Sequence, residues 1–140
     1  MADDEAKNRK LFQDILEAKG YEVSFAEDGQ QALEKVFAAP LDVVLLDVMM
    51  PKLDGYEVCR QLRQDSRTAH LPILMITALR DRVDRLKGIQ AGANDFLTKP
   101  IDAEEIRLRV KNAIHAKRLY DRVQHALVQL KSLETLRDNL

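Results

Sequence analysis

The chain has 140 residues, of which 46% are hydrophobic, so it is long enough for one domain with its own core plus an appendage. Its formal net charge of −1 gives no global reason to expect a nucleic-acid or membrane-surface partner. The single cysteine, Cys59, excludes a disulfide within the chain, and no apolar run approaches the ~20 residues of a membrane-spanning helix. We therefore expect a cytoplasmic protein that binds neither nucleic acid nor membrane directly.

Helical and strand-like patterns alternate along the chain. Gly20 ends the first helical pattern, Asp28 is placed to cap the second helix, and Pro72 introduces a buried strand. The predicted helices cover residues 6–19, 30–39, 56–64, 81–91 and a last segment from about 102 to 140. The predicted strands cover residues 21–26, 42–47, 73–77 and 95–98.

This alternation predicts an α/β fold with a parallel sheet, right-handed crossovers and flanking helices. In such sheets the reactive residues gather at the carboxyl ends of the strands. Asp47, Thr77 and Lys99 each fall at such an end. We therefore expect these three side chains to form one site.

The residue types at these positions suit phosphoryl transfer. The Asp47 carboxylate can attack phosphorus and form an acyl phosphate. Asp3 and Asp4, together with Asp47, form a cluster of carboxylates that suits Mg²⁺. Lys99 can pair with one phosphoryl oxygen, and the Thr77 hydroxyl can donate to another. Catalysis would then consist mostly of positioning and charge neutralisation.

Four stretches give the sequence its resemblance to a known family. They are ADDEAKNRK at 2–10, LLDVMMP at 45–51 followed by Asp54 and Gly55, MITA at 75–78, and AGANDFLTKP at 91–100. Their order and spacing resemble the CheY-like receiver domains of bacterial response regulators in two-component systems. The resemblance covers roughly residues 2–115. It implies a flavodoxin-like sheet with strand order 2-1-3-4-5.

The resemblance also implies a phosphoacceptor and a metal site. Asp47 matches the phosphorylated aspartate of the family. Asp4 matches the direct Mg²⁺ ligand, and Asp3 matches the acid that holds the metal through water. Met49 matches the position whose backbone carbonyl completes the metal site.

A conformational switch is implied in the same way. Thr77 matches the switch hydroxyl, Phe96 the aromatic rotamer switch and Lys99 the phosphate-pairing lysine. The bond between Lys99 and Pro100 is cis in the family.

Each of these residues also has a purely structural interpretation. Asp47 would then only end a strand and cap a turn, and Thr77 would be an ordinary strand residue. Asp3 and Asp4 would only cap the first helix and favour its N-terminal dipole. Phe96 fits a plain core residue as well as a moving switch.

The sequence departs from the family at its beginning. Receivers begin with a strand of apolar residues ahead of the paired acids, whereas this chain reaches Asp3 directly after Met1 and Ala2. The first strand is thus truncated, and Asp3 and Asp4 are expected to lie on a poorly anchored terminus. Residues 21–26 could then pair directly with 42–47, another chain could supply a strand, or the domain could be partly open. We favour the first two outcomes, because both satisfy the backbone hydrogen bonds.

The last 25 residues follow a heptad pattern. The apolar positions are Ala116, Leu119, Val123, Ala126, Leu130, Leu133 and Leu140. Arg137 interrupts this seam. The spacing indicates a coiled-coil signalling helix over residues 116–140, attached to a receiver domain over residues 1–115. Pairing with a second copy of the chain is favoured over folding back on the domain.

The leading hypothesis is a phosphorelay receiver. A histidine kinase or phosphotransfer protein would donate a phosphoryl group to Asp47, and the C-terminal helix would transmit the signal. The protein would not be an enzyme acting on an outside substrate. The alternative is a degenerate, non-phosphorylated receiver that serves as a dimerisation or scaffold module. An aspartyl phosphohydrolase fits less well, because Met49 stands where such enzymes carry a second acid.

Overall fold

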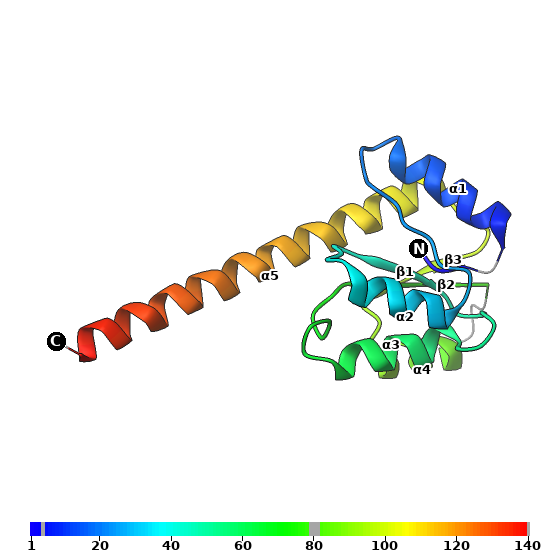
Figure 1. Ribbon diagram of the computed structural model, residues 1–140. Helices are drawn as coiled ribbons and strands as arrows, with labels where there is room; N and C mark the ends of the chain where they lie inside the picture. Colours follow the sequence, from blue (N-terminus) through cyan, green and yellow to red (C-terminus); the bar gives the residue numbers. More distant parts are fainter. Residues whose placement is uncertain (4, 79–81, 140) are drawn as a thin grey trace.

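Helices alternate with three parallel strands in the computed structural model, which describes residues 1–3, 5–78 and 82–139 (Figure 1). The strands are β1 (Val44–Asp47), β2 (Ile73–Thr77) and β3 (Asp95–Thr98). The helices are α1 (Ala6–Glu17), α2 (Gly29–Ala38), α3 (Gly55–Gln64), α4 (Arg82–Ala91) and α5 (Ala103–Asp138). Within the described residues, the sheet order is β1-β2-β3. The predicted parallel α/β architecture is therefore confirmed.

Aspartates begin three of the helices. Asp28 accepts a hydrogen bond from the Gln31 amide at the start of α2. Asp54 accepts one from the backbone amide three residues later at the start of α3. Asp102 accepts from two amides at the start of α5. Such caps satisfy amides that have no partner inside the helix. The prediction that Asp28 caps a helix is confirmed, and the hydrogen bond from the Gln31 amide lowers the pKa of Asp28.

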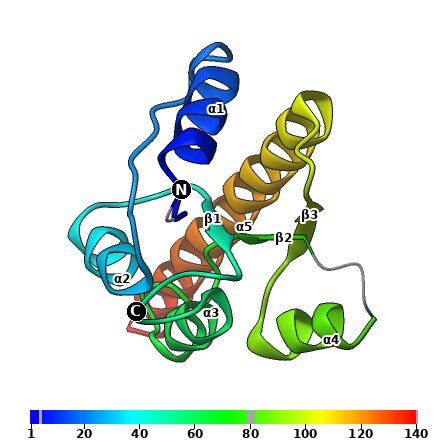
Figure 2. The same ribbon diagram turned by 90° about the vertical axis from the view of Figure 1, so that its right-hand side faces the viewer.

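The sheet lies between two layers of helices. α1 and α5 cover one face, whereas α2, α3 and α4 lie on the other (Figure 2). Successive strand residues point to opposite faces. Leu45 therefore packs toward α1 and α5, whereas Val44 and Leu46 pack toward α2 and α3. All four residues of β1 are buried, as expected for a parallel strand covered on both sides.

The strand predicted at residues 21–26 is wrong. This segment is irregular, and Ala26 alone among its residues forms a bridge, with Ala2. Ala2 forms a second parallel bridge with Leu46 of β1. Direct pairing of 21–26 with 42–47 is therefore also wrong, because the N-terminal residues lie between the two segments.

The first few residues of the chain occupy the position of a first strand. The Ala2 amide donates to the Leu45 carbonyl at 2.8 Å, and the Asp47 amide donates to the Ala2 carbonyl at 2.9 Å. On the other side, the Ala26 amide donates to the Met1 carbonyl at 3.0 Å. The prediction of a truncated first strand is confirmed. Of the three outcomes predicted for this region, direct pairing of 21–26 with 42–47 is the one that the structure contradicts.

Helix α5 begins in the domain and then leaves it (Figure 1). Its buried residues are Ile106, Val110 and Ile114. Every described residue from 121 onward is exposed. The helix is continuous through the boundary proposed at residue 115, so the appendage is a direct extension of the domain. Among the described residues, no helix has both the length and the apolar character needed to cross a membrane.

Ile106 and Leu108 make a matched pair for testing which face of α5 supports the domain. Ile106 is 1% exposed, whereas Leu108 is 59% exposed. We expect Ile106→Ala to lower the free energy of unfolding by about 2–4 kcal/mol, because it leaves a cavity against the sheet. Leu108→Ala should change it by less than about 0.5 kcal/mol. Urea denaturation measures both, and equal losses would contradict this packing.

Candidate functional site

The three strand ends meet at one edge of the sheet. Asp47 lies opposite Ile76 in the β1–β2 register, so Thr77 follows directly beside it. Thr77 in turn pairs with Thr98, and the Lys99 amide donates to the Thr77 carbonyl at 2.9 Å. The predicted convergence of Asp47, Thr77 and Lys99 at the carboxyl edge is therefore a consequence of strand register.

The Asp47 carboxylate is buried, with only 3% of the residue exposed. One oxygen, Oδ1, accepts from the Met49 amide at 2.9 Å, and Oδ2 accepts from Lys99 Nζ at 2.8 Å. A buried carboxylate is costly unless it is hydrogen-bonded and paired. Burial is the largest single effect and lowers the pKa of Lys99, but the hydrogen bond and charge of Asp47, together with the charges of Asp3 and Glu5, outweigh it and raise the pKa of the lysine.

Asp3 is anchored beside Asp47. It is fully buried, and its Oδ1 accepts from the Glu5 amide at 2.9 Å. Its Oδ2 accepts from the Asn8 side chain at 3.3 Å, and its backbone carbonyl accepts from the Arg9 guanidinium at 2.7 Å. The expectation of a poorly anchored terminus is therefore wrong at Asp3. Asp4 lies outside the described residues.

The adjacent carboxylates of Asp3 and Asp47 favour the binding of a cation at this edge of the sheet. Burial, and then the adjacent Asp47 carboxylate, raise the pKa of Asp3 to about 6. Like-charged carboxylates that share a site repel each other, and a divalent cation relieves that repulsion. Within the described part of the chain, no group of three His, Cys, Asp or Glu side chains has metal-binding geometry. The third carboxylate of the hypothesis is Asp4, so Asp3 and Asp47 form a partial set that fits Mg²⁺.

The two predicted switch residues lie in different environments. Thr77 is buried at the end of β2, beside Asp47. The Phe96 ring is half-buried and lies against Gly88 of α4, where a Cβ would stand 2.7 Å from its Cζ atom. Met75 also lies next to this position. Phe96 therefore packs between the sheet and α4 in this structure.

The sequence patterns included Gly55 in a motif but did not predict its structural role. A Cβ at this position would lie 2.5 Å from the Asp47 carbonyl and 3.0 Å from Val48 Cα. The Gly55 amide also donates to the Val48 carbonyl at 3.0 Å. The glycine lets α3 begin directly against the end of β1. Its place just after Asp54, the cap of α3, was the available signal.

Two neighbouring loops, which contain Met49 and Lys99, complete the surroundings of the Asp47 carboxylate. The predicted cis bond between Lys99 and Pro100 is present. Met49 is 71% exposed, and its backbone, not its side chain, contacts Asp47. Lys52, in the loop that contains Met49, lies 3.4 Å from the Asp28 carboxylate. Lys99 is thus the lysine paired with Asp47.

The sequence matches the family model described as the response regulator receiver domain over residues 1–111. It is 44% identical over 124 residues to response regulator PleD of Caulobacter vibrioides, covering 89% of this chain and 27% of that protein. It is 46% identical over 111 residues to the alkaline phosphatase synthesis transcriptional regulatory protein PhoP of Bacillus subtilis, covering 79% and 45%. The chain thus spans less than half of the length of these relatives.

Solved structures are similar over the same region. Chemotaxis protein CheY4 of Vibrio cholerae superposes with a TM-score of 0.76 at 33% identity, covering 80% of this chain and 93% of that one. The receiver domain of sensor histidine kinase PA1611 from Pseudomonas aeruginosa gives 0.76 at 32% identity, covering 81% and 93%. The latter structure has a magnesium ion coordinated in its active-site cleft.

Replacement of Asp3 by asparagine tests the repulsion between the carboxylates. Because the folded-state pKa of about 6 lies above the ordinary value of 3.8, protonated Asp3 is favoured by folding. The stability that protonated Asp3 contributes to the folded state is fully present below pH 4 and is lost as the pH rises through 6. In EDTA at pH 7, Asp3→Asn should therefore be more stable than wild type by about 2 kcal/mol. The difference should shrink toward pH 4 in urea titrations, and a pH-independent difference would contradict the assignment.

Gly55→Ala tests the close approach of α3 to the end of β1. The added methyl group meets backbone atoms that cannot turn aside, so we expect a loss of about 1–3 kcal/mol in the free energy of unfolding. Gln64→Ala, at the exposed end of the same helix, is the control and should be nearly neutral. Thermal unfolding monitored by circular dichroism measures both, and a neutral Gly55→Ala would show that the helix can shift freely.

Proposed function

Since the chain belongs to the response regulator receiver family, we propose that it is the phosphoacceptor of a two-component phosphorelay and is phosphorylated on Asp47. The observation that supports this best is the buried Asp47 carboxylate, held 2.8 Å from the Lys99 ammonium at the carboxyl edge of the sheet. Acceptor and counter-ion are both in place before any phosphoryl group arrives. The donor would be a histidine kinase or a phosphotransfer protein.

Phosphoryl transfer to Asp47 would use the paired carboxylate and ammonium as follows. An Asp47 carboxylate oxygen forms a bond to phosphorus while the phosphorus–nitrogen bond of the donor phosphohistidine breaks, and the leaving imidazole takes up a proton. The Lys99 ammonium turns from the carboxylate to a phosphoryl oxygen, and the Thr77 hydroxyl donates to another. The protein contributes positioning and charge neutralisation. It is modified in the reaction and does not act on an outside substrate.

We assign the Mg²⁺ site to the same edge. Asp3, Asp4 and Asp47 would hold the ion together with the Met49 backbone carbonyl. Bound there, the ion would neutralise charge on the phosphoryl group. The pairing of buried Asp3 with Asp47 supports this assignment, as does the magnesium ion in the similar PA1611 receiver.

Output would pass through the switch residues and α5. Phosphorylation draws the Thr77 hydroxyl toward Asp47 and shifts the Phe96 ring and the surface near α4. The exposed leucines of the projecting part of α5 pair with a second copy in a parallel coiled coil, which places two receivers side by side. The protein works in the cytoplasm, as expected for a partner of the kinase domains that supply phosphoryl groups.

Mass spectrometry after incubation with acetyl phosphate and Mg²⁺ tests phosphorylation. We expect one added phosphoryl group in wild type and none in Asp47→Ala, because the acceptor carboxylate is then gone. Asp54→Ala, in the following loop, is the control and should still gain the group. Absence of any mass gain at saturating donor would instead favour the non-phosphorylated scaffold.

Light scattering coupled to gel filtration tests the coiled coil. Leu130→Glu places a charge in the predicted seam and should shift the protein from dimer toward monomer, with at least a tenfold weaker dimer. Lys131→Glu changes the charge at the next position, outside the seam, and should leave the dimer intact. A wild-type monomer at all concentrations would reject this part of the proposal.

A further inference from the structure

Helix α5 contacts the domain again at the point where it begins to project. Tyr120 is half-buried, whereas every described residue from 121 onward is exposed. Its ring stacks on the ring of His70, with 4.3 Å between the ring centroids and 28° between the ring planes. Aromatic rings prefer such defined relative orientations, so the stack favours one direction of the helix.

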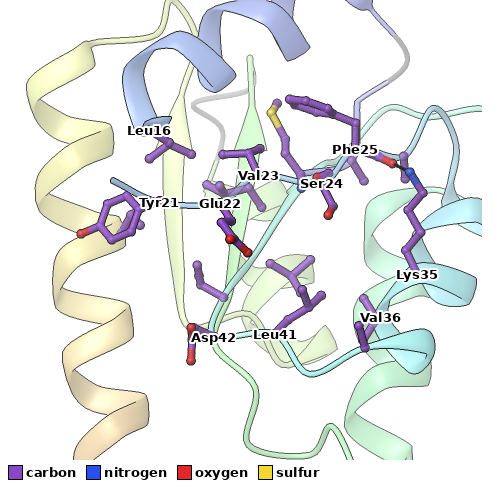
Figure 3. Close-up of a pocket in the computed structure, with 18 of the residues that line it drawn as sticks. Leu16, Tyr21, Glu22, Val23, Ser24, Phe25, Lys35, Val36, Leu41 and Asp42 are labelled. Atoms are coloured by element: carbon purple, nitrogen blue, oxygen red, sulfur yellow. Dashed lines mark hydrogen bonds between the residues drawn. The ribbon is translucent and has the colours of Figure 1, made fainter. Parts of the chain in front are cut away.

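The buried part of α5 ends at Ile114, ahead of this stack. Ile114 and Val110 belong to the core cluster against the sheet. Tyr21 packs against the same cluster, and its ring is directed toward α5 in Figure 3. From Tyr120 to Asp138 the helix extends about 27 Å, so a rotation of about 10° at Tyr120 would displace its far end by about 5 Å. A contact at Tyr120 therefore has a large effect on the position of the projecting helix.

The loop that carries His70 is held in place by Arg63, near the C-terminal end of α3. Arg63 Nη1 donates to the Leu71 carbonyl at 2.6 Å. The same nitrogen donates to the Thr68 and Ala69 carbonyls, each at 3.2 Å. These carbonyls belong to residues on both sides of His70, and the donors of a guanidinium have a fixed planar geometry. A displacement of Arg63 would therefore move His70 as well.

The same guanidinium contacts the end of α4 and the residue before β3. Arg63 Nε donates to the Gly92 carbonyl at 2.9 Å, and Nη2 donates to Asn94 Oδ1 at 2.6 Å. A Cβ on Gly92 would lie 2.6 Å from Arg63 Cγ, so the arginine side chain packs closely against the helix end. Helix α4 also contains Gly88, on which the Phe96 ring packs. Arg63 thus joins the helix beside the predicted switch residue Phe96 to the loop between α3 and β2.

We propose that Arg63 and the His70–Tyr120 stack connect the switch region to α5, so that a displacement of α4 on phosphorylation changes the direction in which the projecting helix leaves the domain. Coupling between separated sites is carried by contiguous contacts that have two arrangements, and these contacts run from Phe96 to Tyr120. The inference rests on the proposed phosphorylation of Asp47. Arg63, His70 and Tyr120 would touch no reacting atom and would act as positioning residues.

Distances between spin labels on the full chain test the stack first without a phosphoryl group. Lys10→Cys in α1 and Ser132→Cys in the projecting helix provide exposed attachment sites, whereas the native Cys59 is fully buried. Dilution with unlabelled protein removes distances between copies. We expect His70→Ala and Tyr120→Ala to broaden the distance distribution by at least about twofold, because the stack is lost. Tyr120→Phe keeps a ring and should retain the wild-type distribution. An unchanged distribution in both alanine variants would overturn the proposal.

Beryllofluoride with Mg²⁺, as a mimic of the phosphorylated state, tests the coupling in the same labelled protein. We expect the mean distance in wild type to change by about 5 Å, since the helix turns at Tyr120. His70→Ala and Arg63→Lys should lose this change. Their affinity for beryllofluoride should stay within about twofold of wild type, because the loop before β2 lies at the opposite end of the sheet from Asp47. Arg60→Lys, which alters an exposed arginine of the same helix, is the control and should keep the change.

Phosphorylation and coupling have separate outcomes in this experiment. An unchanged distance in wild type that binds beryllofluoride would overturn the coupling but not the role of Asp47. The full change in His70→Ala or Arg63→Lys would also overturn it, because the direction of α5 would then be set by other contacts. If beryllofluoride does not bind wild type, the phosphoacceptor role is rejected and the coupling with it. The unliganded distances would still decide whether the stack fixes the direction of α5.

Discussion

The buried carboxylate of Asp47 is the constraint on which the rest of the site depends. A charge held inside the protein must be paired and hydrogen-bonded, and Lys99 and the Met49 amide meet that requirement from two different loops. The pairing ties the end of β1 to the end of β3 across β2. It also leaves Asp3 as a second acid at the same edge, with a raised pKa. The need to stabilise one buried acid therefore brings a lysine and a second acid to the same edge of the sheet.

Local patterns in the sequence were sufficient for most of the fold. The runs at 43–46 and 73–76 are continuously apolar, so the assignment of these segments to buried parallel strands needed no tertiary information, and Asp28 predicted the start of its helix. The predicted convergence of Lys99 with Asp47 is confirmed by the 2.8 Å hydrogen bond between Lys99 Nζ and Asp47 Oδ2. Gly55 could not be interpreted in this way, because its importance lies in a contact with Asp47, eight positions earlier in the sequence, that only the packing of α3 reveals.

The error at residues 21–26 has a physical cause. The segment alternates as a strand does, but a strand also needs a neighbour, and the residues available to pair with it are Met1, Ala2 and Asp3. The N-terminus was expected to be loose for the same reason. In fact Arg9 and Asn8 of α1 hold Asp3 by side-chain contacts that local patterning does not reveal. Asp3 is thus held by contacts with Glu5, Asn8 and Arg9 although the strand is short.

Beryllofluoride, which mimics a phosphoryl group on a carboxylate, offers the most direct measurement of the central claim. Titration calorimetry in Mg²⁺ should detect one site per chain in wild type and none in Asp47→Asn. Lys99→Ala should weaken binding by at least tenfold, because the paired cation is lost. Lys52→Ala should not, because that lysine pairs with Asp28. Unchanged binding in Lys99→Ala, or binding that persists in Asp47→Asn, would contradict the account.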